Sequence, residues 1–166
     1  NRQFYSKRNV YASTKCEVYA ALVLSRHAYN VHTWAWVTEG DLAQWENGIR
    51  SQVASLARNA LRPISPFHFT TAELCALAGI HSPLDTLHAN RLRYVKRAIQ
   101  VAPSSLWSFL HDNTLSQSWI SQLMSSCAWI VRHSRPGKIP TFVEPCDALS
   151  FIALDPHWNG RVKAAL

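Results

Sequence analysis

Apolar residues recur along most of this chain at steps of three and four, which is the spacing of one face of an α-helix. The clearest stripe follows Thr38, and a second follows Ser82. Shorter stripes lie between Leu115 and Val131 and between Asp147 and Leu154. Alternation with a period of two is scarce, so the pattern favours an all-α fold, an irregular helical bundle of about six or seven helices. The two clear stripes consist of Leu42, Trp45, Ile49, Val53, Leu56 and Ala60, and of Leu84, Leu87, Leu92, Val95 and Ile99.

The first helix start is indicated by Thr14 and Glu17, which fit a capping box. In this motif the hydroxyl accepts a hydrogen bond from a first-turn amide and the Glu side chain reaches back to the cap. We expect the helix to cover 15–32. Because the segment from Val18 to Leu24 is apolar on nearly every side, this helix should be buried centrally.

Two further start signals flank a glycine in the middle of the chain. Thr70 and Glu73 fit a second capping box, and the short helix that follows should end at Gly79, where glycine can adopt the left-handed cap conformation. The run from Ser82 to Asp85 combines a cap, a first-turn proline and a first-turn carboxylate. It predicts a helix that runs to about Ala102, before the next proline.

The C-terminal third carries weaker signals. Arg132 to Pro140 is typical of an exposed loop, and Thr141 to Val143 is the only modest strand candidate. A last helix is expected to start at Asp155-Pro156. The chain does not begin with Met and its last residues resemble an unfinished helix, so we expect a piece of a longer product whose parts pack as one unit. These parts are an N-terminal lead-in (1–12), a helical region (13–102) and a C-terminal helical extension (103–166).

Composition favours a folded chain without disulfides. Of the 166 residues 48% are apolar and only 16% are charged, so enough apolar surface can be buried to exclude wholesale disorder. The seven tryptophans mostly occupy helical apolar positions, which favours a core role over base stacking. No apolar run is long enough to span a membrane. The four cysteines, at 16, 75, 127 and 146, lack close spacing and are expected to be reduced, buried thiols.

The formal charge of +7 is concentrated on two helix faces that contain no acidic residue. Each basic face lies on the side of its helix away from the apolar stripe, within roughly 120° in the first case and about 100° in the second. A solvated face is one interpretation, but such faces usually mix both signs of charge. The other interpretation is a surface that neutralises phosphates. The members are Arg50, Arg58 and Arg62 on the first face and Arg93, Lys96 and Arg97 on the second.

Signatures of catalysis and of cofactor or metal binding are absent from the sequence. Glu39 and Asp41 are the closest acidic pair, and capping of a helix start explains them. There is no phosphate-binding loop, dinucleotide fingerprint or nucleophile elbow. His27 and His32 are five residues apart and do not share a helix face. We therefore expect no catalytic residue, no metal and no cofactor.

The order of several motifs resembles a known family. From Lys15, the chain reads Leu22-Val23-Leu24-Ser25-Arg26-His27-Ala28-Tyr29-Asn30 and then Thr33-Trp34. This resembles the region after the catalytic palm in reverse transcriptases of non-long-terminal-repeat (LINE-like) retrotransposons. Similar segments follow in order, and the resemblance is good over 13–100 and weaker beyond. They are Thr71 to Leu77 with Gly79-Ile80 and Pro83-Leu84, then Arg91-Leu92-Arg93-Tyr94, and a tail with Pro156-His157-Trp158 and Val162-Lys163-Ala164.

The resemblance implies a thumb and post-thumb region, with 13–102 as the thumb-like part. In such polymerases the thumb holds the primer–template duplex by its backbone, while aspartates of the palm bind the catalytic metals. The Asp-Asp palm motif is absent here, so the chain is expected to be no enzyme itself. It would bind the backbone of RNA or an RNA–DNA hybrid and hold it for the palm and fingers of the same polyprotein. We expect no membrane partner and a location inside the cell, in the nucleus.

The expected nucleic-acid-binding residues have two origins. Lys15, Arg26, Arg91 and Arg93 match the family pattern, and the helix faces add a further four. Ser25, Tyr29 and Trp34 match too but are interpreted as packing residues. The four that come from the helix faces alone are Arg50, Arg58, Lys96 and Arg97.

Two other classes of function remain open from the sequence. The turn at Gly79-Ile80 between two helices suits a helix-turn-helix DNA-binding domain, although Arg91 and Arg93 come two turns after the start of the second helix. A helical protein-interaction module, or a domesticated retroelement remnant without a nucleic-acid role, is the third class.

Overall fold

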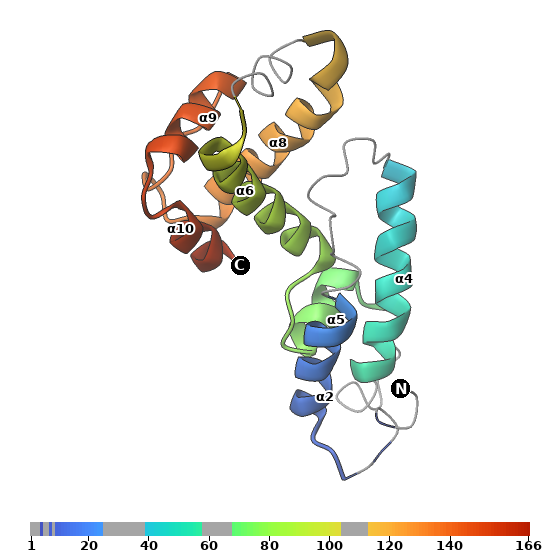
Figure 1. Ribbon diagram of the computed structural model, residues 1–166. Helices are drawn as coiled ribbons and strands as arrows, with labels where there is room; N and C mark the ends of the chain where they lie inside the picture. Colours follow the sequence, from blue (N-terminus) through green and yellow to red (C-terminus); the bar gives the residue numbers. More distant parts are fainter. Residues whose placement is uncertain (1–3, 5–6, 8, 25–38, 58–67, 104–112) are drawn as a thin grey trace. The chain divides into compact units, whose positions relative to one another are not determined.

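The structure is a computed structural model that describes residues 4, 7, 9–24, 39–57, 68–103 and 113–166 (Figure 1). Within these ranges every regular element is a helix. The predicted all-α class is confirmed. Thr141–Val143, the strand candidate, is irregular. The elements in chain order are α2 (Ala12–Tyr19), a short π-helix η1 (Ala20–Leu24), α4 (Glu39–Ala57), α5 (Thr71–Leu77), α6 (Pro83–Val101), α8 (Asn113–His133), α9 (Pro145–Leu154) and α10 (Trp158–Ala165).

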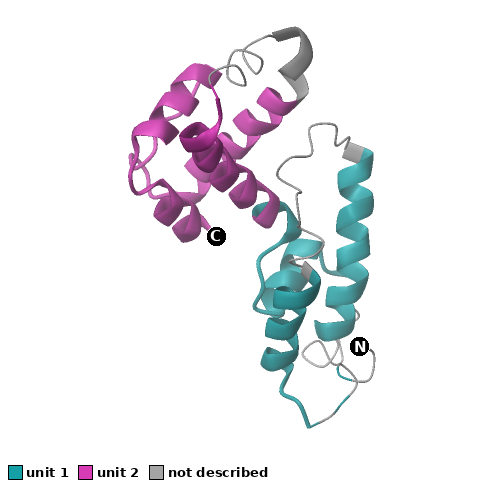
Figure 2. Ribbon diagram, viewed as in Figure 1, with its two compact units in different colours: residues 1–29, 37–85 teal, residues 30–36, 86–166 magenta. Residues whose placement is uncertain are grey.

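The chain divides into two compact units (Figure 2). Unit 1 contains 1–29 and 37–85, and unit 2 contains 30–36 and 86–166. The division falls just after the first residues of α6, whereas the sequence suggested a boundary near Pro103 and a single packed unit. Most of α6 therefore belongs to the same core as the C-terminal helices.

Unit 1 is built on one face of α4. Ile49 and Val53 are fully buried, and Trp45 and Leu56 pack beside them, so the stripe predicted after Thr38 is confirmed from Trp45 to Leu56. The Tyr19 hydroxyl of α2 donates a hydrogen bond of 3.0 Å to the Gln52 side chain of α4. The buried core of this unit consists of Tyr19, Ile49, Val53, Ala57, Leu74 and Cys75.

The start of α2 differs from the prediction. The helix begins at Ala12 after Tyr11, and no side chain caps it, so Thr14 lies inside the first turn and is not the cap. The helix is also not buried all round, because the side chain of Leu22 is 60% exposed. Residues 25–32 of the predicted helix lie outside the described ranges.

The predicted capping of α5 is confirmed at both ends. The Glu73 amide donates to the Thr70 hydroxyl at 3.2 Å, and the Thr70 amide donates to the Glu73 carboxylate at 2.7 Å. At the other end Gly79 has φ of +68°, its amide bonds to Ala76, and the Ile80 amide reaches the carbonyl of Cys75. This pair of bonds is the Schellman arrangement, which needs the left-handed conformation that glycine adopts without strain.

The start of α6 also follows the sequence. The Asp85 amide donates to the Ser82 hydroxyl at 3.1 Å, and the helix ends at Val101, one residue before the predicted end. Leu84 was expected in the apolar stripe but is 42% exposed. In unit 2 the helix packs on α8, α9 and α10 around a core of Ala89, Leu92, Val95, Leu123, Cys127, Trp129, Ile130, Ile139, Ala148, Ile152, Trp158 and Val162.

The tryptophans and cysteines mostly behave as predicted. Trp129 and Trp158 are buried, and Trp45 and Trp119 are partly buried against the two cores, whereas the other three tryptophans lie outside the described ranges. None of the four cysteines forms a disulfide. Three of them are buried, but Cys146 is exposed, contrary to the expectation of buried thiols.

Candidate nucleic-acid interface

The four basic residues of α6 divide into two inward-facing and two outward-facing side chains. Arg91 and Lys96 are buried, with 2% and 8% of their surfaces exposed, whereas Arg97 is exposed and Arg93 is half-buried. The helical pattern placed Lys96 on the outward face together with Arg93 and Arg97, which is wrong for Lys96. A face predicted from one helix alone takes no account of the neighbouring elements that cover it. Here α9 and α10 cover Lys96.

Arg91 is held by polar groups of α8. Its guanidinium donates to the Gln122 side chain at 2.7 Å, to the Gln122 carbonyl at 3.3 Å and to the Ser126 hydroxyl at 3.3 Å. Burial lowers its pKa to about 10, so the group is still charged at neutral pH. Its Nε atom is buried without a partner among the described residues. Arg91 therefore joins α6 to α8 and does not present its charge to a ligand.

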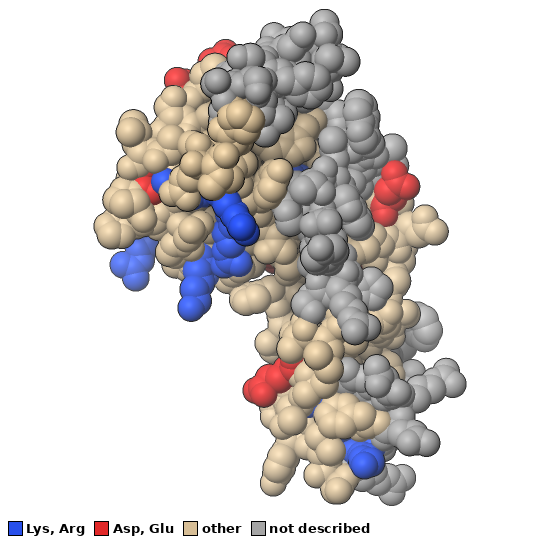
Figure 3. All heavy atoms as spheres, viewed as in Figure 1, with Lys and Arg blue, Asp and Glu red and all other residues tan. Residues whose placement is uncertain are grey.

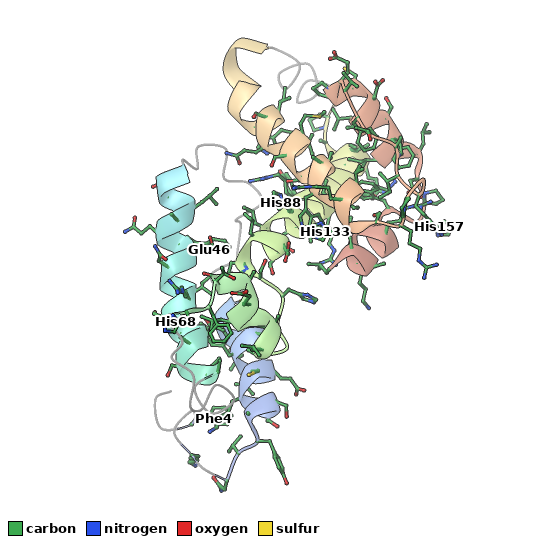
Figure 4. All side chains as sticks on the ribbon, turned by 180° about the vertical axis from the view of Figure 1, so that it is seen from behind. Phe4, Glu46, His68, His88, His133 and His157 are labelled. Atoms are coloured by element: carbon green, nitrogen blue, oxygen red, sulfur yellow. The ribbon has the colours of Figure 1, made fainter. Side chains whose placement is uncertain are left out.

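Two histidines extend this cluster, the buried His88 and the exposed His133 (Figure 4). The Nδ1 atom of His88 lies 3.0 Å from the Ser126 hydroxyl. The Trp129 ring stacks on the imidazoles of both His88 and His133, with centroid distances of 5.7 and 5.0 Å. His133 also bonds to the carbonyl of Trp129 at 2.8 Å. The cluster is a polar and aromatic connection between α6 and α8, with every member tied to another.

Lys96 is held by the end of α9. Its ammonium donates to the carbonyls of Ile152 at 2.8 Å, Ala153 at 2.9 Å and Asp155 at 3.1 Å. An ammonium has three hydrogens, and these three acceptors use all of them. The contact also places a positive charge at the negative end of the helix dipole of α9.

An open hollow on the surface of unit 2 is lined by Arg93 and Arg97 of α6 together with the buried Lys96. Its volume is about 570 Å³, and α10 forms the wall opposite α6. We call it the α6–α10 groove, and its lining contains no acidic side chain. Within the described residues, the charged groups of Arg93, Arg97 and Lys163 make no hydrogen bond or ion pair. The lining residues are Arg93, Lys96, Arg97, Gln100, Asn159 and Lys163.

On the surface of unit 2, basic side chains also lie apart from acidic ones. Lys and Arg side chains (blue) project together at the lower edge of this unit in Figure 3, while most of its acidic atoms (red) in this view lie at the upper edge. By sequence, unit 2 contains nine Lys and Arg against four Asp and Glu, and unit 1 contains eight against six. Most of the net positive charge therefore belongs to unit 2.

The predicted binding residues of unit 1 are not brought together in its described part. Lys15 lies on α2 with 5% of its surface exposed. Arg50 is half-buried on α4 and donates to the carbonyl of Phe69 at 2.8 Å, which supports the turn before α5. Arg26 and Arg58 lie outside the described residues.

Lys163 was missed as a site residue by the sequence reasoning. It is exposed on α10 and separated by 66 residues from Arg97, so no helical pattern could join the two. A signal was nevertheless present, because Lys163 lies in the tail motif with Val162 and Ala164. Gln100 and Asn159 had no signal, because single carboxamides carry none.

The described ranges contain neither a metal-binding cluster nor a membrane-spanning helix. No group of three or more His, Cys, Asp or Glu side chains there could hold a metal ion. None of the helices described is long and apolar enough to cross a membrane. Burial raises the pKa of the Cys75 thiol to about 11 and that of Cys127 to about 12, so neither is an activated nucleophile.

No protein-family model matches the chain, and no curated protein and no solved structure is detectably similar to it. The resemblance to LINE-like reverse transcriptases thus stays a prediction from the sequence motifs alone.

Proposed function

We propose that this chain binds the sugar–phosphate backbone of RNA or an RNA–DNA hybrid through the α6–α10 groove. In this proposal it is the thumb and post-thumb part of a LINE-like reverse transcriptase and contributes no catalytic group itself. The observation that carries the proposal is the lining of the groove, which has four cations, two carboxamides and no carboxylate. The motif order of the sequence supplies the retroelement assignment.

The electrostatics of the groove support a polyanionic ligand. Arg93, Arg97 and Lys163 lie around one hollow without an acidic partner, so they repel one another in the unliganded protein. Phosphates would relieve this repulsion and release the counterions condensed on the nucleic acid. A solvated face needs only one helix, whereas here both α6 and α10 contribute cations to the same groove. Contacts of this kind give affinity with little dependence on base sequence.

The test is binding of the whole chain to a labelled RNA–DNA hybrid at several salt concentrations. Three phosphate contacts predict a slope of log K against log salt of about −2.7, because each contact in a duplex contributes about −0.9. Replacing Arg93, Arg97 and Lys163 together by Gln should remove most of this slope and weaken binding to all sequences alike.

A matched control removes the same charge from another part of unit 2. Arg132, Arg135 and Lys138 are exposed at and after the end of α8 and do not line the groove. Their joint replacement by Gln also lowers the net charge by three, but it should leave the slope nearly unchanged. Equal losses in the two triple variants would contradict the groove as the binding site.

The same experiment separates the other two classes of function. A strong preference for one base sequence would favour a helix-turn-helix domain. No structural observation favours that class, since α5 and the arginine-bearing part of α6 belong to different compact units. Absence of salt-dependent binding to hybrid, RNA and DNA would overturn the proposal in favour of a protein-interaction module.

A further inference from the structure

Lys96 lines the α6–α10 groove but does not resemble its other cations. Its ammonium lies within 2.8 to 3.1 Å of three carbonyls at the end of α9, and the side chain is 8% exposed. Arg97, one residue on, is exposed and has no partner among the described residues. The two neighbours therefore have different roles in one groove.

The carbonyls that Lys96 holds belong to the corner where α9 turns into α10. Directly after this corner the Asp155 carboxylate accepts from the His157 amide at 2.8 Å and from Nε of Arg161 at 2.6 Å. The Trp158 indole then donates to the carbonyl of Leu92 at 3.1 Å. Leu92 and Lys96 are four residues apart and so lie on one face of α6. The start of α10 is thus fixed to α6 at two positions, Leu92 and Lys96, which lie one helical turn apart.

We infer that Lys96 is a positioning residue of the groove and not a phosphate ligand. By holding the end of α9, it places α10 so that Asn159 and Lys163 face Arg93 and Arg97. The inference rests on the proposed function for its ligand, a nucleic-acid backbone, but the contact that carries it is independent of any ligand. A phosphate could recruit the ammonium only by breaking its buried hydrogen bonds to the carbonyls of Ile152 and Asp155, which is costly in a folded interior.

A double-mutant cycle tests this role against direct binding. Loss of one phosphate contact weakens binding about eightfold at 0.1 M salt, because each contact adds about 0.9 decades there. Lys163→Gln should show this loss. Lys96→Met should show a similar loss, because it releases α10 and with it Lys163. If Lys96 acts only through α10, adding Lys163→Gln to Lys96→Met should cost less than about twofold more.

Direct binding by Lys96 makes the opposite prediction. The two losses would then multiply to about 60-fold, and the salt slope would fall by about 1.8. Arg97→Gln is the control, since its loss should multiply with that of Lys96→Met under either mechanism. Multiplying losses for the Lys96 and Lys163 pair would overturn the inference.

A measurement on the unmodified chain covers the case in which Lys96→Met does not fold. Nitrogen NMR of the lysine ammonium groups reports their hydrogen bonding directly. On addition of the RNA–DNA hybrid, the resonance of Lys163 should shift and that of Lys96 should stay in place. A shift of Lys96 as large as that of Lys163 would contradict the positioning role.

Hydrogen exchange separates failure of this inference from failure of the proposed function. The amides of Trp158 and Arg161 bond to the carbonyls of Asp155 and His157 in the corner and first turn of α10. In Lys96→Met these amides should exchange at least tenfold faster without any nucleic acid, while amides of α5 in unit 1 stay unchanged. Unchanged exchange at Trp158 and Arg161 overturns the inference even if the groove binds. Faster exchange in a chain that binds no nucleic acid upholds the anchoring of α10 by Lys96, and overturns the proposed function together with the groove role assigned to Lys96.

Discussion

Helices α4 of unit 1 and α6 of unit 2 have the same length of 19 residues, and each combines an apolar stripe with basic residues outside that stripe. Their basic residues nevertheless end in different surroundings. On α4 the described cation, Arg50, supports a carbonyl before α5. On α6 Arg91 and Lys96 are buried, and Arg93, Lys96 and Arg97 line a groove that a second helix completes with Lys163. A basic helix face becomes a candidate site only where another element adds to it.

The largest expected effect comes from the core residue that joins α10 to α6. Trp158 is fully buried, so Trp158→Ala should destabilise unit 2 by about 3–5 kcal/mol and disrupt the groove. Leu74→Ala, the matched change in unit 1, should cost about 3 kcal/mol and leave binding intact. Both losses of stability are measured by urea unfolding that is monitored through the hydrogen exchange of amides in each unit. Loss of binding in Leu74→Ala would break the comparison, because the groove would then depend on unit 1.

The reactivity of buried thiols compares the stabilities of the cores of units 1 and 2. Under native conditions at pH 8, iodoacetamide should modify exposed Cys146 about a hundredfold faster than Cys75 or Cys127, whose pKa values are raised by burial. With increasing urea, Cys75 should react before Cys127, because the described core of unit 1 has six buried apolar residues against twelve in unit 2. Mass spectrometry of the labelled peptides gives the order, and the reverse order would contradict it.

A smaller effect distinguishes the buried cation of α6 from the half-buried cation of α4. Arg91→Met should cost about 2 kcal/mol, because it leaves polar groups of Gln122 and Ser126 buried without their donor. Arg50→Met should cost about 1 kcal/mol or less, since water can reach the Phe69 carbonyl that it releases. Thermal unfolding of the two variants makes the comparison. Equal costs would show that both helices use their cations in the same way.

The smallest expected effect is a pH dependence confined to unit 1. Hydrogen bonds from the Thr70 amide and hydroxyl lower the pKa of the Glu73 carboxyl below its usual 4.5. The folded state therefore binds the proton less readily than the unfolded state, so the stabilisation is complete above about pH 4.5 and is lost as the pH falls further. Hydrogen exchange of α5 between pH 3 and 6 should show this loss, and Glu73→Gln should abolish it. An acid response of the same size in Glu73→Gln would assign it to another group.

The sequence predicted best what depends on neighbours within one or two turns. The capping box of α5 and its end at Gly79 involve residues only three to five apart, and both are confirmed. The start of α2 was predicted wrongly because a matching pair, Thr14 and Glu17, is also compatible with a helix that begins three residues earlier. Local patterns thus identify helices more securely than they fix the first residue.

The candidate site was only half predictable for a related reason. Helical spacing correctly joined Arg93 and Arg97, which belong to one helix. It could not show that Lys96 meets carbonyls 56 to 59 residues away, nor that Lys163 completes the lining. Such contacts depend on how helices distant in the sequence pack together, and that information is spread over the whole core.

The ammonium of Lys96 also carries a consequence for the order of assembly. During synthesis α6 leaves the ribosome before α9, since Lys96 precedes Ile152 by 56 residues. The last carbonyls of α9 acquire their donor only when that helix docks on a completed α6. We therefore expect the end of α9 to be a late event in folding, with α10 following it, so that the groove forms only after the rest of unit 2 has closed.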